Sequence, residues 1–285
     1  MRRAMELEYV LVDVFAETPL AGNALAVFPD AAGLSDELML AIARETNLSE
    51  TVFVTSAAAD AYASRIFTPG VELPFAGHPT LGTAWVLRSL GRIADGAVTQ
   101  ETKAGATAVD FDGDTVWLER SGDGGTDDAD VPALTRQLGA DDGTMGLMWS
   151  DADGNPVRLT PAVADAGIPQ VMVPLESPHA VDALRASDIR EPEGTFGAYF
   201  FSFTGTDTVK ARFFGAGVGV TEDAATGSAA AGLGLYLGQR LGPGRVRVSQ
   251  GGQIGRPSIL HVQFDRAKVR VGGDVVPIGR GVLTI

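Results

Sequence analysis

The stretch TEDAATGSAAAGLGLYL, residues 221–237, decides the fold of this chain. Glu222 and Asp223, followed by the hydroxyl groups of Thr226 and Ser228, precede a run of small and apolar side chains. A helix that is apolar on every side offers no face to water, so it is expected to be buried all round. Its first N–H groups have no partner inside the helix. The polar residues at its start are therefore either ordinary caps or part of a binding site.

A second stretch of the same kind lies in the first half of the chain. The segments RIFTPGVEL (65–73) and RFFGAGVGV (212–220) share Arg, Phe, Gly and Val at one constant offset. Each is followed by a short polar patch and an apolar run, PFAGHPTLGTAWVLRSLG after the first and EDAATGSAAAGLGLYLGQRLG after the second. Recurrence of strand, polar turn and apolar helix in the same order indicates an internal duplication. The two buried helices are expected to begin at Pro79 and at about Gly227.

Short strand patterns make up most of the remaining sequence. They are YVLVDVF, NALAVF, TVFVT, SRIFT and TVWLER in the first half, and QVMVPL, GAYFFSF, VKARFF, RVRVS, ILHVQF and KVRVGG in the second. One amphipathic helix is expected at SDELMLAIARETN, with Ser35 as its N-cap. Gly232 and Gly234 form helix poorly in water, but inside a barrel they let strands approach the helix axis. The expected fold class is α+β: two similar domains, each a curved, mostly antiparallel sheet wrapped around a central buried helix.

The acidic stretch SGDGGTDDADVPALTRQLGADDG, residues 121–143, is interpreted as a solvated linker. It divides the chain into an N-terminal domain, residues 1–122, and a C-terminal domain, residues 123–269, with the active-site cleft expected between them. The C-terminal VRVGGDVVPIGRGVLTI is typical of a hairpin. Residues 270–285 are expected to complete a sheet, with the first domain as the candidate.

Composition excludes several classes of function. The chain has 285 residues, with 22 basic against 36 acidic side chains and a net charge of −14, which argues against nucleic acid and anionic membrane as partners. Without cysteine there is no disulfide, thiol nucleophile or zinc–thiolate site. No apolar run has membrane-spanning length, and MRRAMELEYVLVDVF lacks the apolar core of a signal peptide. The cytoplasm is the default expectation.

Known ligand motifs are also missing. DADGNPVRLTPA, residues 151–162, begins like a calcium loop, but Ala162 stands where such a loop needs a bidentate glutamate. GAGVGV is not a dinucleotide fingerprint, since no helix opens directly there. The three histidines form no metal cluster of recognisable spacing, so no metal is expected. His179, in a turn, and His261, in a strand, are expected to be structural or at the surface, whereas His78 directly precedes a buried helix. Carboxylate and imidazole chemistry remains, which means proton transfer.

Glu50 is the second candidate for this chemistry. In TNLSETVFV, residues 46–54, it lies where a helix turns into an apolar strand. Such a glutamate is easily held half-buried, and burial raises a carboxyl pKa towards the range that suits general acid–base catalysis. The alternative is an exposed acid at the end of a helix.

Five ordered stretches resemble the signature segments of the PhzF-like phenazine-biosynthesis family. They are VDVFAETPLAGNALAVF, ARETNLSETVFV, RIFTPGVELPFAGHPTLGTAW, GVTEDAATGSAAAG and GGQIGRPSIL, and they run from residue 12 to about 260. The resemblance implies a diaminopimelate-epimerase-like fold of two similar domains, each with a central helix in a sheet. It also implies a homodimer.

The resemblance implies catalytic roles for three residues. Glu50 matches the general acid/base, His78 the cleft histidine, and Asp223 the second acidic group. The related epimerases use two cysteines, which this chain lacks. In the phenazine enzyme the implied reaction is isomerisation of trans-2,3-dihydro-3-hydroxyanthranilate. The glutamate moves a proton from C3 to C1, and the enol product tautomerises to a ketone.

The resemblance also implies substrate-binding residues. Gly77 offers its backbone N–H to the ligand, and Gly227 and Ser228 form a cradle for a small carboxylate substrate. No cofactor is expected, because neighbouring unsaturation or a carboxylate can absorb the charge left by the departing proton. Two alternatives stay open: an epimerase or isomerase acting on another small amino or hydroxy acid, and a non-catalytic small-ligand binding protein on the same fold.

Overall fold

The computed structural model describes residues 5–125, 145–190, 193–215 and 220–285. The chain forms two compact units. Unit 1 comprises Met1–Leu118 and Gly272–Ile285, and unit 2 comprises Glu119–Val271. The boundaries between the units fall inside two strands, β8 (Thr115–Ser121) and β18 (Lys268–Gly273).

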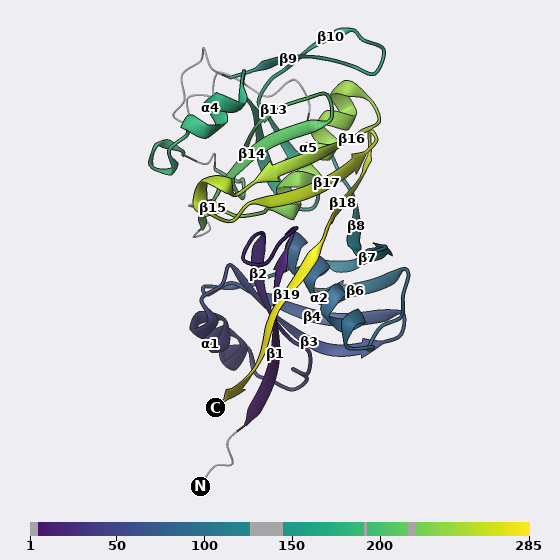
Figure 1. Ribbon diagram of the computed structural model, residues 1–285, viewed down its shortest axis with the longest axis vertical. Helices are drawn as coiled ribbons and strands as arrows, with labels where there is room; N and C mark the ends of the chain where they lie inside the picture. Colours follow the sequence, from purple (N-terminus) through teal and green to yellow (C-terminus); the bar gives the residue numbers. More distant parts are fainter. Residues whose placement is uncertain (1–4, 126–144, 191–192, 216–219) are drawn as a thin grey trace. The chain divides into compact units, whose positions relative to one another are not determined.

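Unit 1 is a sheet with one buried helix packed on it (Figure 1). Its other elements are β1 (Glu6–Val14), β2 (Asn23–Phe28), α1 (Asp36–Thr46), β3 (Glu50–Ala58), β4 (Ala61–Phe67), β5 (Glu72–Leu73), α2 (Gly77–Ser89), β6 (Val98–Thr102), β7 (Gly105–Asp112) and β19 (Val275–Thr284). Most pairings are antiparallel, but β2 pairs parallel with β3, and β4 parallel with β6. The C-terminal strand β19, yellow in Figure 1, runs antiparallel to β1, in purple.

The two helices of unit 1 differ as their sequences do. The amphipathic helix α1 has the predicted N-cap, because the Ser35 hydroxyl accepts the N–H of Leu38 at 3.3 Å. Helix α2 is buried along most of its length and packs against β1, β2 and β3. It begins at Gly77, two residues before the predicted start at Pro79. Proline is tolerated within the first turn, where its missing N–H is not needed.

Unit 2 has the same plan around helix α5 (Gly227–Leu241), which packs against β11, β12, β16 and β17. Its other elements are β9 (Leu147–Ser150), β10 (Pro156–Leu159), β11 (Ala162–Asp165), β12 (Pro169–Pro174), α4 (Pro178–Ala183), η1 (Ala186–Asp188), β13 (Ala198–Phe203), β14 (Thr208–Gly215), β15 (Val220–Asp223), β16 (Gly244–Gln250), η3 (Gly252–Ile254) and β17 (Ser258–Phe264). The close approach expected at Gly234 is present: a Cβ there would lie 2.5 Å from Val269 Cγ2.

The internal duplication is confirmed by the order and pairing of the elements. In unit 1, β2 is followed by α1 and a parallel β3, and β4 is antiparallel to both β3 and β5. In unit 2, β12, α4, β13, β14 and β15 repeat this pattern. The strands that follow the buried helices, β6 and β16, are parallel to β4 and β14.

The duplication extends to an ion pair. Arg65 of β4 makes a bidentate contact to Glu72 of β5, with N–O distances of 2.8 and 2.6 Å. Arg212 of β14 makes the same contact to Glu222 of β15, at 2.8 Å for both bonds. In both repeats the guanidinium also lies over a phenylalanine ring two positions further along the strand. Glu222, one of the two acids ahead of the buried helix, therefore has a structural partner.

Several short elements depart from the sequence-based expectation. ESPHAV was predicted as a turn, but Pro178–Ala183 is a helix, with the Ser177 hydroxyl accepting the N–H of Ala180. Strands β5, β6, β7, β9, β10, β11 and β15 were not predicted. The calcium-like segment is a turn between β9 and β10, in which the Asp151 carboxylate accepts the N–H groups of Asp153 and Asn155.

Two predictions concern residues outside the described part of the chain. The acidic stretch 121–143 is described only as far as Gly125, and residues 216–219 of the second repeat segment are not described. Within the described ranges, no helix has the length and apolar character needed to cross a membrane.

Candidate active site

The half-site of unit 1 joins the start of β3 to the start of α2. Glu50 is the first residue of β3, and His78 is the second residue of α2. His78 Nε2 lies 3.4 Å from Glu50 Oε2, although the two residues are 28 positions apart in the sequence. The Glu50 side chain is 14% exposed, so the alternative of an exposed acid is excluded. Gly77, the first residue of α2, adjoins this pair.

Burial sets the charge of His78. Its side chain is 5% exposed, and desolvation lowers the pKa of the imidazole to about 3. The ring is therefore neutral at physiological pH, and its contact with Glu50 is one between a neutral imidazole and a carboxyl group. On the other side of the ring, Asn23 Nδ2 lies 3.3 Å from His78 Nδ1. Asn23, the first residue of β2, was not among the predicted site residues.

The half-site of unit 2 is built around Asp223, the last residue of β15. The Thr226 hydroxyl donates to Asp223 Oδ2 at 2.7 Å, and Gln250 Nε2 donates to Thr226 Oγ1 at 3.0 Å. Burial raises the pKa of Tyr199, whose hydroxyl stays protonated and donates to Gln250 Oε1 at 2.9 Å. Because Thr226 accepts from Gln250, its own proton is directed to Asp223. This chain of donors holds the carboxylate in one orientation.

The N-cap residues of the two buried helices share one feature. Thr226 is the N-cap of α5 and Ala76 is the N-cap of α2, and neither makes a side-chain capping hydrogen bond. The sequence left open whether Asp223 or Thr226 caps α5, and these two residues bond to each other instead. The N–H groups of the first turn of each helix, including those of Gly77 and Gly227, have no acceptor within the helix, and the N-terminus of a helix favours anionic acceptors.

Ser228, the second residue of α5, is oriented by a fully buried glutamine. Gln170 Nε2 donates to Ser228 Oγ at 3.0 Å, and Gln170 is 0% exposed. A serine hydroxyl that accepts from an amide keeps its own proton for another acceptor. Ser228 itself is only partly buried. The start of α5 thus offers an O–H donor next to backbone N–H donors, an arrangement that fits a carboxylate.

Comparison of the repeats shows that the glutamate has no counterpart in unit 2. Thr51 is paired with Phe67, and Ala198 with Phe214, the matching phenylalanines of the two repeats. The residue before Ala198, Gly197, therefore occupies the place of Glu50. A Cβ at Gly197 would lie 2.3 Å from the ring of a neighbouring phenylalanine, so no side chain fits there. Glu50 is consequently present in only one repeat.

The structure brings the predicted residues together in two sets. Glu50, His78 and Gly77 are adjacent in unit 1, and Asp223, Gly227 and Ser228 lie at the start of α5 in unit 2. The other two histidines are elsewhere, His179 in α4 and His261 in β17.

Sequence reasoning missed three polar partners, which are Asn23, Gln170 and Gln250. The only local signal was the Gly-Asn pair directly before an apolar strand. The glutamines lie in ordinary strand sequences that carry no such signal.

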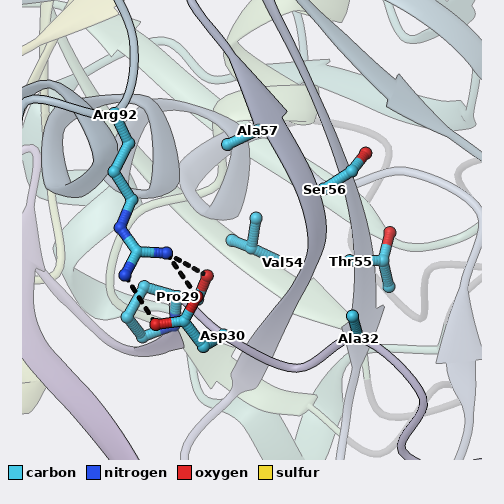
Figure 2. A pocket seen from close by; sticks show the side chains of 8 residues that line it. All are labelled: Pro29, Asp30, Ala32, Val54, Thr55, Ser56, Ala57 and Arg92. Atoms are coloured by element: carbon cyan, nitrogen blue, oxygen red, sulfur yellow. Dashed lines mark hydrogen bonds and ion pairs between the residues drawn. The ribbon is translucent and has the colours of Figure 1, made fainter.

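One cavity of unit 1, of about 460 Å³, is lined by residues at the far end of β3 (Figure 2). Arg92 points into it and makes a bidentate ion pair with Asp30, with N–O distances of 2.5 Å. Its cation is thus already neutralised, and Val54 to Ala57 of β3 form the wall, away from Glu50. This cavity is not part of the half-site. Among the described residues, no group of three or more His, Asp or Glu side chains is arranged to hold a metal ion.

Two units, each with a buried helix packed on a sheet, define an α+β fold of the diaminopimelate-epimerase-like class. Residues 12–281 match the family described as phenazine biosynthesis-like protein, PhzC-PhzF, and the chain belongs to this family. It is 37% identical to trans-2,3-dihydro-3-hydroxyanthranilate isomerase of Pseudomonas chlororaphis, over 97% of this chain and 99% of that protein. It is also 37% identical to an uncharacterized isomerase of Pasteurella multocida, over 97% and 94%.

The solved structures agree on the fold. The crystal structure of a PhzF-family phenazine biosynthesis protein of Bacillus anthracis has a TM-score of 0.79 at 22% identity, covering 99% of this chain and 100% of that one. The expected fold class and the expected isomerase class are thus confirmed.

Proposed function

We propose that this chain moves a proton between two carbon atoms of a small carboxylic acid, with Glu50 as general acid and base and without a cofactor. The observation that supports this proposal is the contact between Glu50 and the neutral His78. The uncharged imidazole, whose Nε2 lies 3.4 Å from Glu50 Oε2, brings no positive charge that would hold the glutamate ionised. Glu50 can therefore accept a proton and give it back.

The other residues are proposed to bind the substrate. The N–H groups at the start of α5, with Gly227 and the hydroxyl of Ser228, take its carboxylate, and Gly77 offers a further N–H. Asp223 and His78 hold an amino or hydroxyl group of the substrate.

We propose trans-2,3-dihydro-3-hydroxyanthranilate as the first substrate to test, because the Pseudomonas chlororaphis relative is named for it. Glu50 would take the proton from C3, and the electrons of the broken C–H bond would move into the conjugated ring. The same proton would then form the new bond at C1, so that the product is an isomer. Its enol would tautomerise to a ketone.

The test is proton NMR of the purified protein with this substrate in D2O, alongside Glu50→Gln and Asp223→Asn. Wild type is expected to consume the substrate, and deuterium from the solvent is expected to enter the ring when the enol becomes the ketone. Glu50→Gln is expected to be inactive, because an amide cannot accept the proton. An active Glu50→Gln protein would exclude the glutamate as the base. An inactive wild type would remove this substrate.

A second candidate is an isomerase or epimerase of another small amino or hydroxy acid, because a relative of equal identity is named only as an isomerase. A non-catalytic binding protein is the third. Glu50→Gln separates the binding protein from the enzymes. A binding protein keeps its ligand affinity in calorimetry, whereas an enzyme loses turnover.

We further propose a cytoplasmic homodimer whose only ligand is a small molecule, with no nucleic acid or membrane partner. The net charge of −14 supports the exclusion of polyanionic partners. Light scattering coupled to size exclusion tests the dimer.

A further inference from the structure

Asn23 approaches the imidazole of His78 from the side opposite to Glu50. Its Nδ2 lies 3.3 Å from His78 Nδ1, and both residues are at least 96% buried, with exposures of 3% and 4%. In the structure the amide oxygen of Asn23 faces the Ser49 hydroxyl, with Oγ 3.5 Å from Oδ1, and the NH2 group faces the ring. An NH2 group has no lone pair to offer. The ring nitrogen beside it must therefore be the acceptor.

The two neighbours of the ring select the same tautomer. A neutral imidazole carries one N–H, and the amide of Asn23 requires Nδ1 to be unprotonated. The proton is then on Nε2, which faces Glu50 Oε2 at 3.4 Å. The other tautomer would place two N–H donors against each other at Nδ1 and a nitrogen lone pair against the carboxyl oxygen. Desolvation lowers the pKa of His78 to about 3, which excludes the doubly protonated ring near neutral pH.

We propose that Asn23 is a positioning residue, which holds His78 in the Nε2–H tautomer so that the imidazole presents a fixed N–H donor to Glu50. This inference rests on the proposed function for its catalytic consequence. At 3.4 Å, Nε2 and Oε2 do not form a hydrogen bond in this structure. Catalytic hydrogen bonds often form or tighten only when substrate binds. A donor in place stabilises the carboxylate before it takes a proton, and releases it as the proton arrives.

The backbone before Asn23 supports this role. Asn23 is paired with Val14 at the closed end of β1 and β2. The buried carboxylate of Asp13 accepts the N–H of Leu20 at 2.8 Å, although Leu20 has a φ of +65°, a conformation that costs a non-glycine residue about 1 kcal/mol or more. This partly buried hydrogen bond fixes the turn into β2, three residues before Asn23.

Unit 2 has a related contact made by different residues. The second residue of its buried helix is Ser228 in place of His78, and Gln170 of β12 donates to the serine hydroxyl at 3.0 Å. Gln170 is not the counterpart of Asn23, because Val171 pairs with Ala198 as Ala26 pairs with Thr51, which matches Gln170 with Leu25. In each repeat a buried amide thus contacts the second residue of the buried helix, from a different position along the strand.

The test uses Asn23→Asp, which preserves size but replaces the donor by a carboxylate acceptor. The carboxylate requires a proton on Nδ1, so the tautomer should reverse and the Nε2 lone pair should face Glu50. Long-range proton–nitrogen NMR of nitrogen-15-labelled protein reports which ring nitrogen carries the proton. The chain has only three histidines, and His78→Asn assigns the relevant signals. Asn155→Asp, the same change at an exposed turn, is the matched control.

Wild type and Asn155→Asp are expected to show a protonated Nε2 and an unprotonated Nδ1, whereas Asn23→Asp shows the reverse. For turnover, Asn23→Asp should lower kcat on the order of 100-fold or more, with a smaller effect on KM. A wild-type signal with the proton on Nδ1 overturns the proposal, even if Asn23→Asp fails to fold. Reversal of the tautomer with unchanged kcat would overturn the catalytic consequence. The NMR measurement needs no substrate, so it tests the tautomer of His78 even if the proposed function is wrong.

Discussion

Burial of His78 predicts a specific loss of stability in mild acid. In the folded protein desolvation lowers the pKa of the imidazole to about 3, against 6.5 for the free side chain. Between these two values the unfolded chain binds a proton that the folded chain does not. Stability therefore falls as the pH decreases through about 6.5 towards 3. At about pH 5 the linkage relation gives a loss of ~2 kcal/mol from this one residue, with almost none at about pH 7.5.

The measurement is urea unfolding of wild type and His78→Asn at about pH 7.5 and about pH 5. Acidic groups also make the stability of any protein depend on pH, so only the difference between the two proteins is informative. Wild type should lose ~2 kcal/mol more than His78→Asn on acidification. His179→Asn, which changes an exposed histidine, is the control and should follow wild type. Equal losses in wild type and His78→Asn would refute the reasoning, because the ring would then be protonated in the folded protein.

Three further predictions concern packing and the start of α5. Arg212→Met leaves the carboxylate of Glu222 without its ion-pair partner. The two side chains are only 6% and 9% exposed, so the free energy of unfolding should fall by ~3–5 kcal/mol. Arg65→Met should cost clearly less, since that arginine is 22% exposed and its glutamate keeps a lysine partner; equal losses in urea titration would contradict this. Gly238→Ala places a Cβ 2.0 Å from a carbonyl oxygen and should lower the free energy of unfolding by ~1–3 kcal/mol. A Cβ at Gly252 has no atom within 4 Å, so Gly252→Ala should leave stability nearly unchanged. Thermal unfolding compares the two variants. Gln170→Leu removes the hydrogen-bond donor to Ser228, the second residue of α5, and should raise KM for a carboxylate substrate. The circular dichroism spectrum should be unchanged. An unaltered KM would show that this amide does not contribute to substrate binding.

The buried helices were predictable because their signal is local. A run of small and apolar residues with no polar face is buried in any tertiary context, and the repeat of RIFTPGVEL as RFFGAGVGV pointed to two copies of one plan. The exact start of α2 was missed by two residues, since the proline inside the first turn looks like a first helical position. Helix α4 was missed because its six residues are too few to show a periodic pattern.

The short strands were missed for a related reason. Strand β5 has only two residues and β15 only four, and neither shows alternation of apolar and polar side chains. Their existence depends on β4 and β14, which supply the hydrogen-bonding edge. Whether such a short segment forms a strand depends more on the neighbouring strand than on its own sequence.

Among the polar residues, the sequence alone determined which chemistry was possible, and the tertiary structure determined which groups perform it together. The absence of cysteine and the three scattered histidines left carboxylate and imidazole as the only candidates, and Glu50 and His78 stood at the starts of apolar elements. That Glu222 is an ion-pair partner, while Asp223 is held by Thr226, could not be read from two adjacent acids. The choice depends on the face of the sheet on which each side chain of β15 lies, because successive residues of a strand point to opposite faces. A hydrogen bond between residues far apart in the chain leaves no periodic pattern in the sequence.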